Sequence, residues 1–547
     1  MRTTKTFLQP EWIVAILITA AAVVLHLYFW LHIGGLWRDE ANMANDFGGH
    51  SFSEMARDST PVLGPLIVHG WRMAGGQSDL ALRFLGLLFG LGMLAVLWVA
   101  SWKIRRAPPL AGLVLFGLNS TVIIFGDSLR PYGLGSLFAM ALVTAAFLFL
   151  QKPSTMRAVW LALFAVLSVQ TLYHNIVIVA AVCFGVWVVC WRRKDKRAAF
   201  QIFCVAALAA ISLLPGLNAL LSNPDASQVL RKGMNRFRFI ESYENAFDYP
   251  VTGYIYDWIL LAGIIILRAC LHVWQKPSAS PAPAKTDKAF SGDDLCLFAS
   301  VTLILAAAGF PIFFWYAQLT MATWYQIPLM ALAAVCFDAA LPVFRGILRI
   351  VFLAFVVITA VLSTPKTFGY LTSHFSNVNH YSQLLAEQAA PGDYIVVCPW
   401  NYAITFDYYF KNATPWDTLP PLSDHSVHRY DLIKLQMQNT NAIAPVLQQI
   451  SRTLQSGHRV WVLADTRWMD TFKPGTPPLS LPPPPPLKYS GWADSPYSDA
   501  WTSQAAHFIA DHGDTFQELP PPKDLQAEKF TFENMKLFVA NGWKTNQ

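Results

Sequence analysis

The chain consists largely of long apolar runs separated by short polar segments. An α-helix needs about 20 residues to cross the hydrocarbon core of a bilayer. Eleven runs approach that length, near 12–33, 80–101, 110–126, 132–150, 158–172, 175–191, 199–221, 254–274, 294–316, 326–344 and 347–363. The pattern therefore predicts a polytopic α-helical membrane protein with about eleven transmembrane helices, which form a domain over residues 1–363.

The remaining residues, 364–547, have the pattern of a different kind of domain. A turn signal, Pro391-Gly392-Asp393, leads into a β-branched run at 394–397, and a second such run lies at 459–463. A helical stretch is expected near 429–456, and alternation of strand and helix favours a small α/β domain. A proline-rich segment at 474–487 contains five consecutive prolines and predicts a stiff spacer or loop instead of a fold element.

Composition and charge agree with a membrane protein and indicate its orientation. Of 547 residues, 54% are hydrophobic and 14% are charged, whereas soluble domains carry roughly 25% charged residues. The net charge of +6 is small and scattered, which argues against nucleic acid as a partner. One set of alternate loops holds 17 Lys and Arg residues against 9 in the other set. The positive-inside rule then places the N-terminus in the cytoplasm, and an odd helix number places the C-terminal domain outside.

The loops expected on the outer side contain ionisable residues next to the apolar runs. Arg38, Asp39 and Glu40 follow the first run directly. If they begin a surface helix, the two acids point about 100° apart, so only one of them can face a given substrate. Ionisable residues at a membrane edge are candidates for function, but acids in the first turn of a helix are also favoured by its dipole.

Three further outward segments carry candidate residues. Arg130 and Tyr132 join two runs, Arg83 lies near the start of another, and His174 lies in a tight hairpin. An arginine there binds an anionic phosphate in bidentate fashion or extends to the lipid headgroups. The histidine either donates to phosphate, shuttles a proton or serves as a polar helix cap.

The 222–253 loop has four basic residues, which either bind a phosphate or an acidic acceptor or are simply solvated: Arg231, Lys232, Arg236 and Arg238. Asp424, His425 and His428 in the C-terminal domain suggest metal ligands. We set this reading aside because so few histidines in a soluble domain rarely bind a metal.

Taken together, these segments resemble the GT-C superfamily of membrane glycosyltransferases, in particular the bacterial relatives of protein O-mannosyltransferases and of the lipid A aminoarabinose transferase. That family carries an Asp-Glu pair after the first helix, here Asp39-Glu40. Its other motifs are matched at a proline-rich stretch over 60–66, the Gly76 to Arg83 segment, Arg130-Pro131-Tyr132-Gly133-Leu134 and Tyr173-His174. Trp324-Tyr325-Gln326-Ile327-Pro328 matches an Arg-Tyr-x-x-Pro segment, but the expected arginine is missing, with Ala322 and Thr323 in its place.

The resemblance implies a polyprenyl-phosphate-linked sugar as donor and an active site on the outer face. Asp39 would be the base that deprotonates an acceptor hydroxyl on a lipid, glycan or protein, with Glu40 as a substitute or support. Arg83, Arg130 and His174 would stabilise the departing phosphate, and Tyr132 would orient it. A single displacement would invert the sugar's anomeric centre. No divalent metal and no other cofactor are expected, and the acid and the basic residues should meet in one hollow.

Other classes of function remain open at this point. A transporter or flippase of a lipid-linked sugar would place ionisable residues near the bilayer midplane, where Asp257 and Asp338 are the deeper acids. An oligosaccharide polymerase or ligase would share the lipid-linked type of donor. A non-catalytic assembly partner would tolerate substitution of Asp39 and Arg130.

Overall fold

The computed structural model describes residues 9–45, 61–216, 236–274 and 292–544, with short gaps at 318, 320, 467, 469, 471–474, 486–492 and 524. Within these residues the chain forms two compact units. Unit 1 contains residues 9–31, 61–216 and 236–371, and unit 2 contains residues 32–45 and 372–544. The segment that carries Asp39 and Glu40 therefore belongs to unit 2, although it lies near the N-terminus of the chain.

Unit 1 is a helical bundle. Its helices are α1 (Pro10–His32), α4 (Leu63–Met73), α5 (Asp79–Arg105), α6 (Leu110–Gly112), α7 (Ser120–Gly126), α8 (Tyr132–Gln151), α9 (Thr155–Val169), α10 (Asn175–Arg192), α11 (Lys196–Ser212), α13 (Arg236–Phe247), α14 (Tyr254–Trp274), α15 (Gly292–Ala317), α16 (Ile327–Ala340) and α17 (Ile347–Leu371). Eight helices in the described part of the chain are long and apolar enough to cross a membrane.

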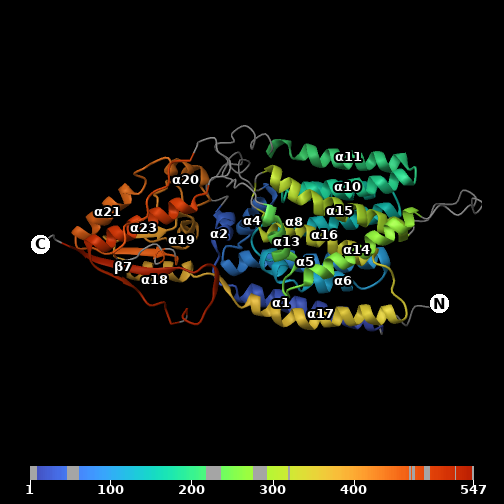
Figure 1. The fold of residues 1–547 in the computed structure, drawn as a ribbon, viewed down its shortest axis with the longest axis horizontal. Helices are drawn as coiled ribbons and strands as arrows, with labels where there is room; N and C mark the ends of the chain where they lie inside the picture. Colours follow the sequence, from blue (N-terminus) through green and yellow to red (C-terminus); the bar gives the residue numbers. More distant parts are fainter. Residues whose placement is uncertain are drawn as a thin grey trace, which may run out of the picture. The chain divides into compact units, whose positions relative to one another are not determined.

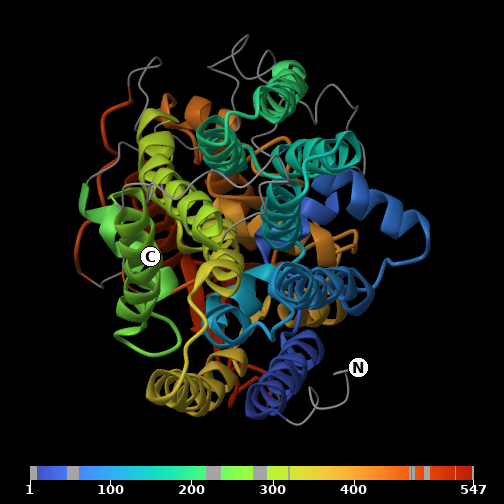
Figure 2. The ribbon, with the colours of Figure 1, turned by 90° about the vertical axis from the view of Figure 1, so that its right-hand side faces the viewer.

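The bundle packs around short, buried helices. Helix α16 is apolar except for Asp338, and nearly all of its residues are buried; it packs against α8, α5 and α15. Helices α1 and α17 run side by side in both views (Figures 1 and 2). An ion pair between Glu11 and Arg349 and a ring contact between Tyr28 and Phe368 join these two helices.

Three of the predicted transmembrane runs form helices that are too short to cross a bilayer. The runs at 158–172 and 326–344 become α9 and α16, of 15 and 14 residues. The run at 110–126 is broken into α6, a π-helical turn (Leu113–Gly117) and α7. Asn119 causes the break, because its side-chain oxygen accepts from the Val122 N–H and caps α7. Its side-chain N–H₂ also donates to the carbonyl of Tyr249.

Unit 2 is an α/β domain. Its central sheet has the strand order β3-β2-β4-β7-β5, and a two-stranded sheet pairs β1 with β6. The strands are β1 (His374–Ser376), β2 (Tyr394–Cys398), β3 (Trp416–Thr418), β4 (Val460–Ala464), β5 (Gly513–Glu518), β6 (Phe530–Glu533) and β7 (Lys536–Trp543). The pairs β2–β3 and β2–β4 are parallel, whereas β7 runs antiparallel to β4 and β5.

Helices cover both faces of the central sheet. They are α18 (Val378–Gln388), α19 (Ala403–Tyr409), α20 (Tyr430–Met437), α21 (Ala444–Gln455) and α23 (Ser495–His512), and a further helix, α2 (Arg38–Asn45), packs against α19. Helices α20, α21 and α23 pack on the face that bears Val396 and Val462, and α18 and α19 on the face that bears Ile395 and Leu463. Alternate residues of one buried strand thus enter two separate cores.

The sequence locates β2 and β4 to within a residue at each end, and an α/β domain forms as predicted. The stretch near 429–456 is helical as predicted, and it is divided into two helices, α20 and α21. Between them the side chain of Asn439 accepts from the Asn441 N–H and forms a turn. Residues 475–485 of the proline-rich segment form neither helix nor strand, and they bond to α23 at Ser503 and Gln504.

Candidate functional site

The two adjacent acids of α2 have different surroundings. The side chain of Asp39 keeps 17% of its surface exposed, whereas Glu40 is completely buried. This difference follows from their 100° separation around the helix axis. Asp39 is therefore the acid of the pair that a substrate in solution can reach, and Glu40 belongs to the interior of unit 2.

Asp39 lies between two basic side chains of unit 2. Its Oδ1 atom is 3.2 Å from Nε2 of His428 and 3.8 Å from Nε of Arg38. The guanidinium of Arg38 lies over the rings of Trp37 and Tyr402, at 5.5 and 5.4 Å from their centroids. The carboxylate is thus held by partners that are themselves fixed by aromatic packing.

Charge around Arg38 keeps it ionised. Burial lowers the pKa of this guanidinium, but the nearby Asp39, Tyr402 and Glu533 outweigh burial and leave the pKa above its ordinary value. Arg38 therefore stays a cation beside Asp39.

A buried glutamate anchors the first turn of α2. One oxygen of Glu533 accepts the backbone N–H of Arg38 at 2.8 Å and the hydroxyl of Thr405 at 2.9 Å. The other oxygen accepts the hydroxyl of Ser376 at 2.6 Å. Burial raises the pKa of Glu533 to about 7, although Arg38 and these hydrogen bonds oppose the rise. An acid at this place also suits the positive end of the α2 dipole.

In unit 1, a run of aromatic rings joins two of the predicted phosphate-binding residues. The guanidinium of Arg130 lies 5.7 Å from the ring centroid of Tyr132. The Tyr132 ring is 5.7 Å from that of Tyr325, which in turn is 5.4 Å from the His174 ring. The segment from Trp324 onward, matched above to a family motif, thus lies at the centre of this cluster.

His174 is buried among aromatic rings and is neutral. Phe310 and Phe314 pack on its ring at 5.7 and 5.6 Å, and burial lowers its pKa to about 3. The Nε2 atom has no hydrogen-bond partner among the described residues. A buried polar atom without a partner is uncommon in a folded protein and indicates a water or ligand atom at that place. His174 can therefore exchange a hydrogen bond with a ligand, but it brings no positive charge.

Arg83 is buried on α5, one turn before a close helix contact. A Cβ atom on Gly86 would lie 1.9 Å from the carbonyl oxygen of Asp127, so only glycine allows this approach. The Asp127 carboxylate is 2.6 Å from Nδ1 of His26 in α1. These contacts fix the start of the loop that carries Arg130.

Some predicted residues cannot be placed. Arg231 and Lys232 lie outside the described residues, as do the side chains of Arg236 and Arg238 at the start of α13. Over the part of the chain that is described, no group of three or more His, Cys, Asp or Glu side chains could hold a metal ion.

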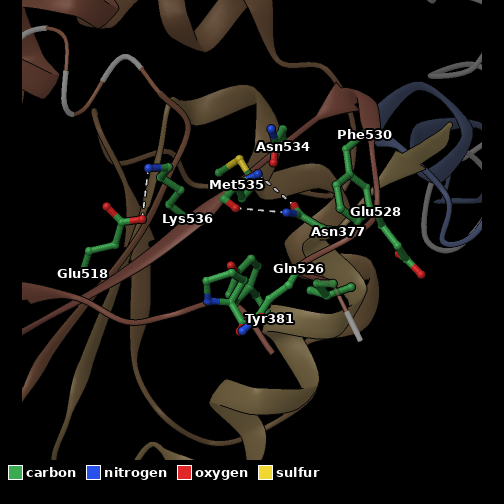
Figure 3. A pocket seen from close by; sticks show the side chains of 11 residues that line it. Asn377, Tyr381, Glu518, Gln526, Glu528, Phe530, Asn534, Met535 and Lys536 are labelled. Carbon is green, nitrogen blue, oxygen red and sulfur yellow. Dashed lines mark hydrogen bonds and ion pairs between the residues drawn. The ribbon is translucent and has the colours of Figure 1, made fainter. Parts of the chain in front are cut away.

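Unit 2 also contains a small cavity of about 210 Å³, lined mainly by the chain between Glu518 and Lys536, with Asn377 and Tyr381 at the start of α18 (Figure 3). Several of its polar side chains are engaged by the protein itself. Asn377 exchanges two hydrogen bonds with the backbone of Met535, and Glu518 pairs with Lys536 at 3.0 Å. None of the residues predicted from the sequence lines this cavity.

The structure thus gathers the predicted residues into two groups. Arg130, Tyr132 and His174 belong to the aromatic cluster of unit 1, and Arg38, Asp39 and Glu40 belong to unit 2. The expectation that both groups meet in one hollow stays a prediction. The residues that sequence reasoning missed are His428, which it considered only as a metal ligand, and Glu533. No local pattern marks either, because their partners lie 389 and 495 residues away.

Comparison with solved structures finds the same fold in ArnT of Cupriavidus metallidurans. The apo form aligns with a TM-score of 0.50 at 10% identity, over 82% of this chain and 92% of ArnT. ArnT bound to undecaprenyl phosphate gives 0.48 at 11% identity, over 82% and 93%. The oligosaccharyltransferase of Archaeoglobus fulgidus, in complex with Zn and sulfate, gives 0.47 at 10% identity, over 84% and 68%. No protein-family model and no curated protein matches the chain.

The likeness to apo ArnT confirms the predicted fold class at the level of the fold, a polytopic helical membrane protein with a C-terminal α/β domain. Together with the eight helices of membrane-spanning type, it makes the chain an integral, multi-pass membrane protein.

Proposed function

We propose that this protein is a glycosyltransferase that moves a sugar from a polyprenyl-phosphate carrier to an acceptor outside the membrane. The class of donor follows ArnT, which shares the fold and has been crystallised with undecaprenyl phosphate. The observation that carries the proposal is the state of the two acids on α2. Asp39 is reachable and held by basic partners, whereas Glu40 is buried.

Asp39 acts as the base in this proposal. A phosphate leaving group is already a weak base, so the reaction needs little help from a general acid. It needs a carboxylate to take the proton of the acceptor hydroxyl, and positive charge to stabilise the departing phosphate. A direct displacement by the acceptor oxygen then inverts the anomeric centre. Glu40, being buried, supports α2 and does not replace Asp39.

The departing phosphate is proposed to interact with Arg83 and Arg130, with Tyr132 orienting it. Arginine suits this task because its planar guanidinium binds two phosphate oxygens at once. His174 is neutral, and its Nε2 atom has no partner among the described residues. We assign it a hydrogen bond to the donor in place of the charge that the sequence suggested. Arg38 and the basic loop residues Arg231, Lys232, Arg236 and Arg238 remain candidates for contacting substrate.

The acceptor is a lipid, a glycan or a protein, and the reaction is proposed to need no divalent metal or other cofactor. The excess of positive charge in alternate loops favours a cytoplasmic N-terminus and an extracytoplasmic C-terminal domain. A bacterial inner membrane is the expected location.

A transporter or flippase of a lipid-linked sugar is the alternative from another class. It is disfavoured by Asp338, one of the two deeper acids that would have served such a role. Its two carboxylate oxygens each accept a backbone N–H at 3.0 Å, from Ala111 and Gly112 at α6. An acid engaged in this way caps a helix terminus and is not free to bind a cargo.

The proposal is tested by deleting the gene in the source organism and restoring either the wild type or the Asp39→Asn variant. Mass spectrometry of envelope glycans, proteins and carrier lipids identifies the unit transferred. We expect one sugar to disappear from its acceptor and its polyprenyl-phosphate form to accumulate in the deletion strain. Wild type should reverse both changes and Asp39→Asn neither, at equal protein level. Full restoration by Asp39→Asn would favour a transporter, polymerase or assembly partner and would overturn the assignment.

A further inference from the structure

The segment before α20 brings a histidine against the proposed base. We propose that His428 is a positioning residue for Asp39: its neutral ring orients the carboxylate, and its protonation switches the base off. This inference rests on the proposed function, because it assigns a partner to the residue that carries the reaction there. Nε2 of His428 lies 3.2 Å from Oδ1 of Asp39, and each side chain keeps 17% of its surface exposed.

Helix α2 meets this segment at three successive positions of one face. Besides the Asp39–His428 contact, Oδ1 of Asn42 accepts the backbone N–H of His428 at 2.8 Å. The side chain of Asn45 donates to the carbonyl of Ser426 at 2.9 Å. Residues three apart on a helix share a face. The carboxylate and the imidazole are therefore aligned by the backbone on both sides and not by a chance rotamer.

The segment itself is stiffened by ion pairs. Arg429 bridges Asp424 at 2.8 Å and Asp431 at 2.7 Å. Burial pushes the pKa of Asp424 up, but hydrogen bonds from Ser426 and Arg429 hold it below its ordinary value. Asp424 therefore stays ionised well into acid, and the segment keeps its shape over the pH range in which a histidine changes charge.

The two ring nitrogens of His428 have different surroundings: Nε2 contacts Asp39, and Nδ1 has no hydrogen-bond partner among the described residues. The ring stacks on Tyr430 at 5.5 Å with an angle of 7° and meets the edge of Trp400 at 6.4 Å. Its Nδ1 atom is buried and has no hydrogen-bond partner among the described residues. A proton on Nδ1 would leave a buried donor unsatisfied, which costs free energy. The neutral ring therefore carries its proton on Nε2, and this N–H donates a hydrogen bond to Asp39.

The charges that face this pair come from several elements of unit 2. Arg38 lies on α2 with Asp39, and the pair of Asp424 and Arg429 lies on the segment of His428 itself. The remaining titratable neighbours are Tyr402, Tyr430, Asp431 and Glu533. Protonation of His428 would add a second cation to the Arg38 side of Asp39. A carboxylate between two cations is a weaker base.

The reaction step can be written without any proton passing through His428. The acceptor hydroxyl gives its proton to the carboxylate of Asp39. The hydroxyl oxygen forms a bond to the anomeric carbon, and the bond from that carbon to the phosphate oxygen breaks. Both electrons of the broken bond leave with the phosphate. His428 stays neutral and holds the first oxygen throughout.

The test compares His428→Gln and His428→Ala with wild type in membranes of the deletion strain. The probe is the radiolabelled carrier lipid identified by the first experiment, and transfer is measured from pH 5 to 9. Glutamine donates a hydrogen bond but does not titrate. We expect wild-type activity to fall toward acid pH as the imidazole gains a proton, whereas His428→Gln activity should not follow that fall. The ratio of His428→Gln to wild-type activity should therefore rise several-fold between pH 7.5 and pH 5.5.

At pH 7.5 we expect His428→Ala to lower kcat about 100-fold or more, with KM within about twofold, because a general base contributes about 100- to 10,000-fold when positioned. The matched control is His425→Gln. His425 lies three residues away, stacks on Trp416 at 4.6 Å and sits 3.6 Å from Asp417. This control should keep the wild-type pH profile.

A second readout separates positioning from folding. Exchange of the C2–H of His428 for deuterium, followed by mass spectrometry of the purified protein, reports the pH at which its ring is protonated. We expect Asp39→Asn to move that midpoint to lower pH, and to leave the midpoint of His425 unchanged. If His428→Gln keeps the wild-type pH profile and the midpoint does not move, the inference is wrong even when Asp39→Asn is inactive. If Asp39→Asn is active, it is the proposed function that falls.

Discussion

Removing the carboxylate of Glu533 should loosen α2 by an amount that depends on pH. This carboxylate accepts three hydrogen bonds in the interior, from the Arg38 backbone and from the hydroxyls of Ser376 and Thr405. In a Glu533→Ala variant these donors lose their acceptor. Each buried donor left unsatisfied costs about 1–3 kcal/mol. The helix that carries Asp39 would then open more often.

The loss is partly offset because the buried charge is itself unfavourable. The pKa of Glu533 is raised from 4.5 to about 7, and each pKa unit corresponds to about 1.4 kcal/mol, so ionisation in the fold costs about 3 kcal/mol above pH 7. The contribution of this group to stability is complete below about pH 4.5 and is lost as the pH rises through about 7. Glu533→Ala should therefore cost about 2–4 kcal/mol at pH 8 and about 3 kcal/mol more at pH 5.

Hydrogen–deuterium exchange of the peptide over residues 36–45, in the purified full-length protein, measures this opening. We expect Glu533→Ala to lower the protection of that peptide by about 30- to 1,000-fold at pH 8, after correction for intrinsic exchange. Glu533→Gln keeps the shape of the side chain without its charge. The protection of the peptide in this variant should equal or exceed that of wild type at pH 8. Glu518→Ala is the control, because its pair with Lys536 is exposed and worth less than about 1 kcal/mol. A larger effect of Glu533→Ala at pH 8 than at pH 5 would refute the reasoning.

Two further predictions concern unit 1. Gly86→Ala places a Cβ atom 1.9 Å from the carbonyl oxygen of Asp127, so the two backbone segments must move apart at a cost of about 1–3 kcal/mol. The midpoint temperature of thermal unfolding in detergent should fall by several degrees. Gly263→Ala, whose Cβ atom meets no atom within 4 Å, should change that temperature little. His174→Phe keeps the packing and removes an unpartnered Nε2 atom; we expect unchanged or higher thermal stability but at least tenfold slower transfer, and normal transfer would exclude His174 from donor binding.

The elements that the sequence predicts well are those specified by neighbours along the chain. Strands β2 and β4 are short runs of β-branched and aromatic residues, bounded by turns, and a buried parallel strand has that pattern. The orientation of Asp39 away from Glu40 follows from helix geometry alone. The sequence of the edge strand β5 has no strong apolar pattern, and the strand forms because its backbone pairs with β7.

What the sequence could not predict is which distant groups share one place. His428 follows a polar stretch with no helix or strand of its own. Its proposed role depends on its contacts with Asn42 and Asp39 on α2. The same limit applies to His174, which reads as a polar loop residue but is enclosed by rings from α15 and the Thr323–Gln326 turn. Contacts between residues far apart in sequence leave no periodic signal in either partner.

Three acids discussed above differ in how far protein groups enclose their carboxylates. Asp338 is engaged by two backbone N–H groups, and Asp127 is buried against His26, where burial raises its pKa to about 6. Both arrangements suit a structural role, because Asp338 binds the backbone at α6 and Asp127 pairs with a buried histidine. Asp39 is held on one oxygen by a histidine and remains partly exposed. An acid that is oriented yet accessible is what deprotonation of an acceptor requires, and this contrast favours an enzyme over a transporter.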